Sequence, residues 1–180
     1  MRPHWTTPRT TLLIALASLF VISGALAVCL WDCPSERLDL EGPTLDKLDW
    51  NLVSLLGEAE NLALRSDKVS FVTVWATWCP PCLREMPKIQ NLHERFGEQM
   101  NFLCISAEDP GEVRRFAQQQ GLTLPLYTTD DSPPQSLAIE NLPTTFIISR
   151  EGRLLFRHEG FKDWDDSGAL SLIRQAIKKG

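Results

Sequence analysis

Cys79 and Cys82 are the side chains of this sequence best placed to do chemistry. Two residues separate them, and they stand between a β-branched, aromatic run at 69–75 and a stretch of helical periodicity. A reactive cysteine must be a thiolate, whereas a free thiol with a pKa of about 8.5 is mostly protonated at neutral pH. The N-terminus of a helix favours an anion through its unpaired N–H groups and its dipole. The spacing therefore predicts a redox-active pair at the start of a helix.

The spacing also predicts different roles for the two thiols. Cys79 is expected to be exposed at the helix start, with Cys82 shielded one turn further in. Cys79 would attack a substrate disulfide to form a mixed disulfide, and Cys82 would then attack Cys79 and release the reduced substrate. Pro81 suits a first helical turn. Because Pro80 and Pro81 both lack an N–H, they should stabilise a thiolate less than a Gly-Pro linker would, which predicts a reducing pair.

A zinc site and a purely structural disulfide are the two alternatives for this pair. A structural zinc site needs a second pair of ligands. A disulfide across two residues closes a very short loop and stabilises little. The remaining cysteines and histidines supply no second pair at zinc-site spacing; they are Cys29, Cys33, Cys104, His4, His93 and His158. Redox catalysis is therefore the favoured interpretation, Cys104 is expected to be an inert core thiol, and His158 a structural residue.

The elements that must position the pair alternate along the chain. Hydrophobic periodicity predicts strands and helices in the order β-α-β-α-β-(α)-β-β-α. The expected strands cover 69–75, 101–106, 124–128, 144–149 and 154–158, and the expected helices 83–96, 111–120 and 168–178, with a helical turn at 136–139. This order predicts an α/β fold with a central sheet covered on both faces. A tight turn at Glu151-Gly152 makes the last two strands an antiparallel hairpin, so the sheet is mixed.

The first 31 residues have a different character from the rest. Arg2 and Arg9 precede an uncharged run from Thr11 to Trp31, which is long enough for a membrane-spanning helix. The positive flank predicts an N-terminus inside and a domain outside the membrane. The alternative is a signal peptide cleaved after Ala25-Leu26-Ala27. Under both interpretations the domain is exported, which in a bacterium means to the periplasm. An uncleaved segment would anchor it in the membrane, and a cleaved one would leave it soluble.

The chain divides into three expected segments. Residues 1–31 are the anchor or signal segment, 32–66 a tether and N-terminal extension, and 67–180 the folded domain. Leucines between 45 and 56 recur at near-helical spacing, so this extension fits a short helix, while strand pairing remains an alternative. Cys29 has the bulky Val28 before it, which fits a lipoprotein site poorly, and the role of Cys33 stays open. A net charge of −5 gives no electrostatic basis for binding nucleic acid.

Two segments resemble a known family. The segment Val74-Trp75-Ala76-Thr77-Trp78-Cys79-Pro80-Pro81-Cys82-Leu83-Arg84-Glu85-Met86-Pro87 resembles the active-site segment of TlpA/ResA-type proteins, and Leu142-Pro143-Thr144-Thr145-Phe146 resembles their second signature. The resemblance spans about residues 67–178, with 111–128 similar to the family's helix–strand insertion. It implies a thioredoxin-like fold tethered to the outside of a membrane.

The resemblance also implies roles for single residues. Pro143 would be a cis proline that faces the cysteines, and the backbone of Leu142 would bind an extended substrate, with Thr144 beside them. Trp78 would shape the exposed face, and Trp75 would lie in the core. Glu85 would tune the pKa of the cysteines and assist proton transfer. Thr73 stands where plain thioredoxin has a buried aspartate, and this difference favours Glu85 as the group that handles the proton. The alternative is that Glu85 is a solvated surface carboxylate.

By resemblance, the function is reduction of protein disulfides with electrons from a membrane thiol carrier. The protein is expected to be a monomer. It needs no cofactor or metal beyond the Cys79–Cys82 pair. Apocytochrome c is the family's best-known client, but the Gly-Tyr-Gly-Ala-Pro-Glu type pattern of cytochrome-maturation members is absent. A disulfide-introducing oxidant is an alternative, and only the redox potential distinguishes it from a reductase. Ala76 disfavours a peroxidase, and the two-residue spacing disfavours a copper chaperone. The client and the direction of electron flow stay open.

Overall fold

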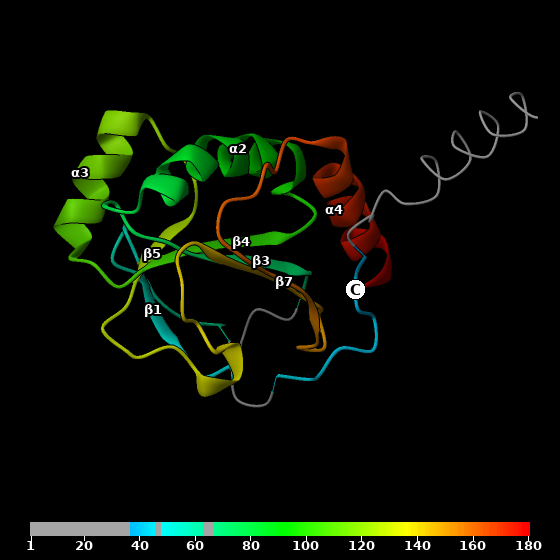
Figure 1. Cartoon of the computed structure of the whole chain (residues 1–180). Coiled ribbons are helices and arrows are strands. Elements are labelled where there is room, and N and C mark those ends of the chain that lie inside the picture. The colour runs from blue at the N-terminus through cyan, green and yellow to red at the C-terminus, as the bar shows by residue number, and fades with distance from the viewer. Residues whose placement is uncertain (1–36, 46–47, 63–66) are drawn as a thin grey trace, which may run out of the picture. The chain divides into compact units, whose positions relative to one another are not determined.

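The computed structural model describes residues 37–45, 48–62 and 67–180, and in this part of the chain one sheet carries three α-helices (Figure 1). The strands are β1 (Asn51–Ser54), β2 (Ala59–Asn61), β3 (Ser70–Val74), β4 (Asn101–Ser106), β5 (Leu126–Thr128), β6 (Thr144–Ile148) and β7 (Leu154–Glu159). The helices are α2 (Pro80–Phe96), α3 (Pro110–Gln120) and α4 (Ser167–Lys179), with a short 3₁₀ helix η2 (Gln135–Leu137). The predicted order of elements from 69 onward is confirmed.

The sheet is mixed, with strand order β2-β1-β5-β4-β3-β6-β7. β3, β4 and β5 are parallel neighbours, while β6 pairs with β3 and with β7 in antiparallel register. Each β-α-β crossover is right-handed as a rule. Because β3, β4 and β5 follow one another in a single direction across the sheet, α2 and α3 must lie on the same face. Figure 1 shows α4 on that face as well.

Residues of the central strands alternate between two apolar clusters. In β3, Phe71 faces the helices while Val72 faces the opposite cluster, and in β4, Phe102 and Leu103 divide in the same way. β4 is buried along its whole length. Strands buried on both sides read as continuous hydrophobic runs, which is why these segments were recognisable in the sequence.

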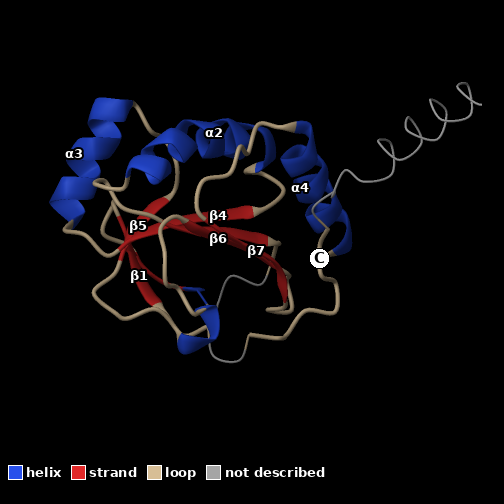
Figure 2. Cartoon of the chain, in the orientation of Figure 1, coloured by secondary structure: helices blue, strands red, loops and turns tan. Residues whose placement is uncertain are grey.

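The face opposite the helices is covered by irregular segments and not by helices. Leu45, Leu48 and Trp50 from the N-terminal extension pack there with Leu137 of η2. Figure 2 shows these loops and the 3₁₀ helix on the side of the sheet away from α2, α3 and α4. Both faces of the sheet are therefore covered, as expected, but by different kinds of structure.

The N-terminal extension takes the strand alternative in its second half. β1 pairs with both β2 and β5 in antiparallel register. Leu52 is buried and Val53 exposed, which is the period of a strand and not of a helix. Gly57 has a φ of +88° in the turn between β1 and β2, a conformation that glycine adopts without penalty. The short-helix interpretation of the leucine spacing is therefore wrong for residues 51–54, which form β1.

The predicted anchor or signal segment, residues 1–31, lies outside the described residues, as do Cys29 and Cys33. Within 37–45, 48–62 and 67–180, no helix is both long and apolar enough to cross a bilayer. The division into segments at 31 and 66 stays a prediction.

Candidate active site

Cys79 and Cys82 form a disulfide at the N-terminus of α2. Cys79 is the N-cap residue of this helix, with an extended backbone, and its Sγ accepts a hydrogen bond from the backbone N–H of Cys82 at 3.3 Å. One donor of the first helical turn is therefore aimed at the sulfur where a thiolate would form. This geometry stabilises negative charge on Cys79 relative to Cys82.

The two prolines of the motif occupy the first two positions of the helix. Pro80 and Pro81 are N1 and N2, so neither supplies a backbone N–H to the N-cap sulfur. An N-cap side chain normally accepts from the N–H of N2 or N3. Only the N3 donor, the N–H of Cys82, remains here. The linker therefore limits how strongly the helix can stabilise a thiolate at Cys79.

The expected difference in exposure between the two cysteines is absent in the disulfide form. Cys79 is 3% exposed and Cys82 1% exposed. Both side chains belong to the apolar cluster between α2 and the sheet, and the bond between their sulfurs holds them there. The prediction of an exposed Cys79 is therefore wrong for the oxidised protein. Trp78, directly before it, is 70% exposed and provides the accessible surface at this point.

Glu85 lies one turn after Cys82 on the buried side of α2 and is only 1% exposed. The alternative of a solvated surface carboxylate is therefore wrong. The indole N–H of Trp164 donates a hydrogen bond to Oε1 of Glu85, while Oε2 has no partner among the described residues. Burial raises the pKa of Glu85 from 4.5 to about 7, and the hydrogen bonds from Trp164 and the Lys162 backbone, with the charge of Lys162, oppose this shift only in part.

Three side chains at three-residue spacing on α2 hold the loop before α4. Glu85 accepts from Trp164 as described. Lys88 Nζ forms an ion pair with both carboxylate oxygens of Asp163 at 2.8 Å. Asn91 donates from Nδ2 to Asp165 at 2.9 Å. Residues i, i+3 and i+6 lie on one side of a helix, so this arrangement fixes Trp164 over the carboxyl of Glu85.

Leu142, Pro143 and Thr144 form the turn that leads into β6. The Leu142–Pro143 peptide bond is cis, as the resemblance implied. The Pro143 carbonyl accepts from the N–H of Gly160 at 2.8 Å, and Thr144 Oγ1 donates to the Asn141 carbonyl. Within the described part of the chain, no hydrogen bond uses the N–H or carbonyl of Leu142. That backbone is therefore available to an extended peptide.

The loop between β3 and α2 is anchored by a carboxylate from the next crossover. Glu108 Oε2 accepts from the Thr77 N–H at 2.7 Å and from Ser106 Oγ at 2.8 Å, and Glu108 Oε1 accepts from Thr77 Oγ1 at 2.6 Å. Hydrogen bonds to a charged acceptor are stronger than neutral ones. Glu108 therefore fixes the backbone two residues before Cys79.

Sequence reasoning missed Glu108 and Trp164, because each reaches the site from a distant loop. Trp164 is 79 positions from Glu85, and Glu108 is 31 positions from Thr77. The signal for Trp164 was a single tryptophan in the charged run Lys162-Asp163-Trp164-Asp165-Asp166. A large aromatic side chain is seldom kept in such a run unless it packs inward.

Residues left out of the predicted site are also accounted for. Cys104 is a fully buried free thiol in β4, and burial and the nearby charge of Glu85 hold its pKa well above the usual range. Thr73, in the position of the aspartate of thioredoxin, accepts a hydrogen bond from Thr145 Oγ1 at 3.0 Å. Trp75 is buried in the core as expected. The His158 ring stacks on Phe156, and its Nε2 lies 3.3 Å from the Phe161 carbonyl oxygen.

Known proteins share sequence and fold with this chain. The family model described as Redoxin matches residues 46–173. The thiol-disulfide oxidoreductase ResA of Halalkalibacterium halodurans is 30% identical over 148 residues, which cover 81% of this chain and 84% of that protein. The thioredoxin-like protein YneN of Bacillus subtilis is 30% identical over 116 residues, 62% of this chain and 68% of that one.

A solved structure supports the fold. A crystal structure from Chlorobium tepidum, described as a candidate thiol:disulfide interchange protein DsbE, superposes with a TM-score of 0.67 at 21% identity. The match covers 79% of this chain and 98% of that one. At this identity the likeness concerns the fold alone.

The disulfide at the start of α2, together with the similarity to ResA, places this chain in the class of thiol–disulfide oxidoreductase enzymes. Within this class, the chain belongs to the Redoxin family and is a TlpA/ResA-like member, so the resemblance read from the sequence is confirmed.

Proposed function

We propose that this oxidoreductase acts outside the cytoplasm as a reductase of protein disulfides, with Cys79 as nucleophile and Cys82 as resolving thiol. The observation that carries the proposal is the position of Cys79 as N-cap of α2, with the Cys82 N–H directed at its sulfur. This position activates the thiol of Cys79 and leaves the thiol of Cys82 one helical turn further along. The client is a protein disulfide, and the redox-active group is the cysteine pair itself.

The proposed reaction begins with both cysteines reduced. The Cys79 thiolate attacks one sulfur of the client disulfide, so a Cys79–client disulfide forms and the other client sulfur leaves as a thiolate. Cys82, once deprotonated, attacks the Cys79 sulfur and releases the second client thiolate. The Cys79–Cys82 disulfide is the product, and a thiol donor must reduce it for the next cycle. By resemblance, we assign that donor role to a membrane thiol carrier.

Glu85 is the proposed proton acceptor and donor for this cycle. A group whose pKa lies near the working pH can take up and release a proton with little cost. The pKa of Glu85, about 7, satisfies this condition because burial disfavours its charged form. The carboxyl lies one turn from Cys82, the thiol that must lose its proton before resolution.

We base the proposed direction of electron flow on the linker. A low thiol pKa at the nucleophile stabilises the reduced form and makes a disulfide oxidising. Because Pro81 at N2 removes one of the two N–H donors that an N-cap sulfur normally accepts, the thiolate is less stabilised and the disulfide form is favoured. This supports reduction of clients over the alternative of disulfide introduction.

The client-binding face is proposed to comprise Trp78, Leu142, Pro143 and Thr144. Trp78 offers an exposed indole beside the disulfide, and the unbonded backbone of Leu142 can pair with an extended client segment. Thr144 is buried and supports the turn through its bond to Asn141, so it shapes this face without exposing its own side chain.

Two experiments test the proposed function. The first is the equilibrium reduction potential of the Cys79–Cys82 pair against glutathione. A value below that of glutathione is expected, and a value near those of strong oxidants would contradict the reductase. The second is a Cys82→Ser trap, which should accumulate client joined to Cys79. A matched Cys79→Ser variant should trap nothing; equal trapping by both variants would refute the assigned roles.

Export rests on residues 1–31 and is tested on the full-length chain. We expect thiol-alkylating reagents that do not cross membranes to label the reduced pair in intact cells. Resistance of the protein to alkaline extraction would identify an uncleaved anchor, whereas a processed N-terminus would identify a signal peptide. Labelling only after lysis would contradict export by either route.

A further inference from the structure

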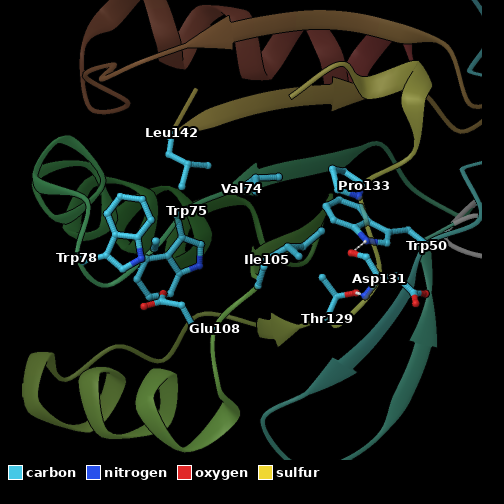
Figure 3. Close-up of a pocket in the computed structure, with 12 residues that line it drawn as sticks. Trp50, Val74, Trp75, Trp78, Ile105, Glu108, Thr129, Asp131, Pro133 and Leu142 are labelled. Carbon is cyan, nitrogen blue, oxygen red and sulfur yellow. Dashed lines mark hydrogen bonds between the residues drawn. The ribbon is translucent and has the colours of Figure 1, made fainter. Parts of the chain in front are cut away.

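A cavity of about 260 Å³ lies beside the candidate active site, at the carboxyl ends of the parallel strands (Figure 3). Val74 ends β3, Ile105 lies at the end of β4, and Thr129 follows β5, and all three line the cavity. Ligands of α/β sheets bind outside the carboxyl ends of parallel strands. A cavity of this volume can hold one large side chain of a client but not a folded segment of it.

Three indoles are among the side chains that line the cavity. Trp50 comes from the N-terminal extension, Trp75 from the end of β3, and Trp78 from the active-site turn. The Trp50 ring is held by a bond from Nε1 to the Asp131 carbonyl at 3.3 Å, and the Trp75 ring packs on Phe116 of α3 at 5.5 Å between centroids. Walls of this kind favour a flat aromatic ring, because aromatic pairs are stabilised beyond the area they bury.

One polar group of the wall lacks a partner. Trp75 is 1% exposed, and its indole N–H makes no hydrogen bond within the described part of the chain. Figure 3 shows the nitrogen on the edge of the ring that faces Ile105, another lining residue. A buried donor without an acceptor is unfavourable, so an occupant that brings an acceptor to this point gains affinity.

Two carboxylates are the charged groups that the described residues contribute to the cavity wall. They belong to Glu108, which is engaged with Thr77 and Ser106, and to Asp131, which accepts from Asn51 Nδ2 at 3.0 Å. Among residues 37–45, 48–62 and 67–180, no lysine or arginine lines this cavity. Repulsion between like charges therefore excludes an acidic side chain.

We propose that this cavity is a subsite of the client-binding face, which receives one uncharged aromatic side chain next to the reacting client cysteine, with tyrosine as the best match. A phenol oxygen can accept a hydrogen bond from the Trp75 N–H, and the phenol O–H can donate a hydrogen bond to a carboxylate. The inference rests on the proposed function, because Trp78 and Leu142 belong to both the cavity and that face.

The test uses the reduced full-length protein and short peptides whose cysteine is joined to 5-thio-2-nitrobenzoate. Cys79 attacks the peptide sulfur, a Cys79–peptide disulfide forms, and coloured thionitrobenzoate leaves. The leaving group is the same throughout, while the residue on either side of the cysteine is alanine, phenylalanine, tyrosine or glutamate. We expect tyrosine to raise kcat/KM about 10-fold or more above alanine, with phenylalanine between them and glutamate below alanine.

Two variants probe the wall, and one serves as control. Trp75→Phe keeps a ring but removes the N–H, so kcat/KM for the tyrosine peptide should fall to that for the phenylalanine peptide. Ala107→Leu narrows the cavity and should abolish the advantage of both aromatics. Ala59→Leu, an exposed change in β2, should leave the ranking as it is.

The outcomes separate the subsite from the proposed function. Aromatic peptides no faster than the alanine peptide, or a ranking that survives Ala107→Leu, would overturn the subsite while the alanine peptide still reports reduction by Cys79. If no peptide reacts at all, the proposed function fails and the subsite fails with it.

Discussion

The indole N–H of Trp164 donates a hydrogen bond to the carboxyl of Glu85, across 79 positions of sequence and inside the apolar cluster below the cysteine pair. The contact joins the loop before α4 to the buried side of α2. It favours the charged form of a carboxyl that burial otherwise drives toward the neutral form. Trp164 is therefore expected to set the protonation of Glu85 without touching the sulfurs.

Trp164→Phe tests this coupling, since it keeps an aromatic ring against Phe71 but removes the N–H. Loss of a hydrogen bond to a charged group should raise the pKa of Glu85 further, by about one unit or more. The acid limb in the pH profile of disulfide reduction should shift to higher pH by the same amount. Phe156→Leu is the control, because it removes a ring contact with Trp164 and leaves the hydrogen bond. An unshifted profile in Trp164→Phe would assign Trp164 to packing alone.

Pro81→Ala tests the link between the linker and the redox potential. It restores the N2 N–H, a donor that the N-cap sulfur can accept. The thiol pKa of Cys79 should fall, and the reduction potential should become less negative by on the order of 10–30 mV, the equivalent of one net hydrogen bond. Pro110→Ala restores an N–H at the start of α3 instead and should leave the potential unchanged. A potential that moves equally in both variants would mean that the effect is not local to Cys79.

Glu108 and Thr77 should be energetically coupled, because two of the three hydrogen bonds of this carboxylate go to Thr77. We expect Thr77→Val and Glu108→Gln each to lower the free energy of unfolding by about 1–3 kcal/mol. The double variant should lose less than the sum, with a coupling of about 0.5–3 kcal/mol. Urea unfolding of the four proteins measures the cycle. Strict additivity would show that the loop before Cys79 does not depend on this contact.

The strand, the cysteine turn and α2 were predictable because their signals are local. The β-branched run, the two prolines and the helical spacing from Leu83 to Phe96 each specify structure within a few residues. The N-cap position of Cys79 follows from the same segment. Helical geometry also placed Glu85 on the side of Cys82.

The burial of Glu85 was not predictable, since a carboxylate gives no hydrophobic signal and its partner lies in another part of the chain. The first two strands were ambiguous for a related reason. Over so short a stretch, the pattern around Leu52 fits both a helical and a strand period. The pairing of β1 with β5 makes this segment a strand. The exposure of Cys79 depends on how the two sulfurs pack together with α2, which spacing does not encode.

Glu85 should also make the stability of the fold depend on pH, in the sense opposite to a salt-bridged carboxylate. Its pKa is raised by burial from 4.5 to about 7, so between these values the folded protein binds more protons than the unfolded chain. The free energy of unfolding therefore falls as the pH rises through this window. The loss of stability caused by ionising the buried Glu85 is absent below about pH 4.5 and complete above about pH 7. It then amounts to about 3 kcal/mol, at roughly 1.4 kcal/mol per pKa unit.

Glu85→Gln removes this ionisation while an amide oxygen still accepts the Trp164 N–H. We expect the variant to match the parent protein near pH 4.5 and to exceed its stability by up to about 3 kcal/mol at pH 8, in urea unfolding at a series of pH values. Disulfide reduction at pH 7 should become slower in the same variant, because it lacks the proposed proton acceptor. Glu98→Gln, at an exposed position after α2, is the control and should show no comparable gain. A stability difference that is equal at both pH values would mean that Glu85 does not titrate between them in the folded protein.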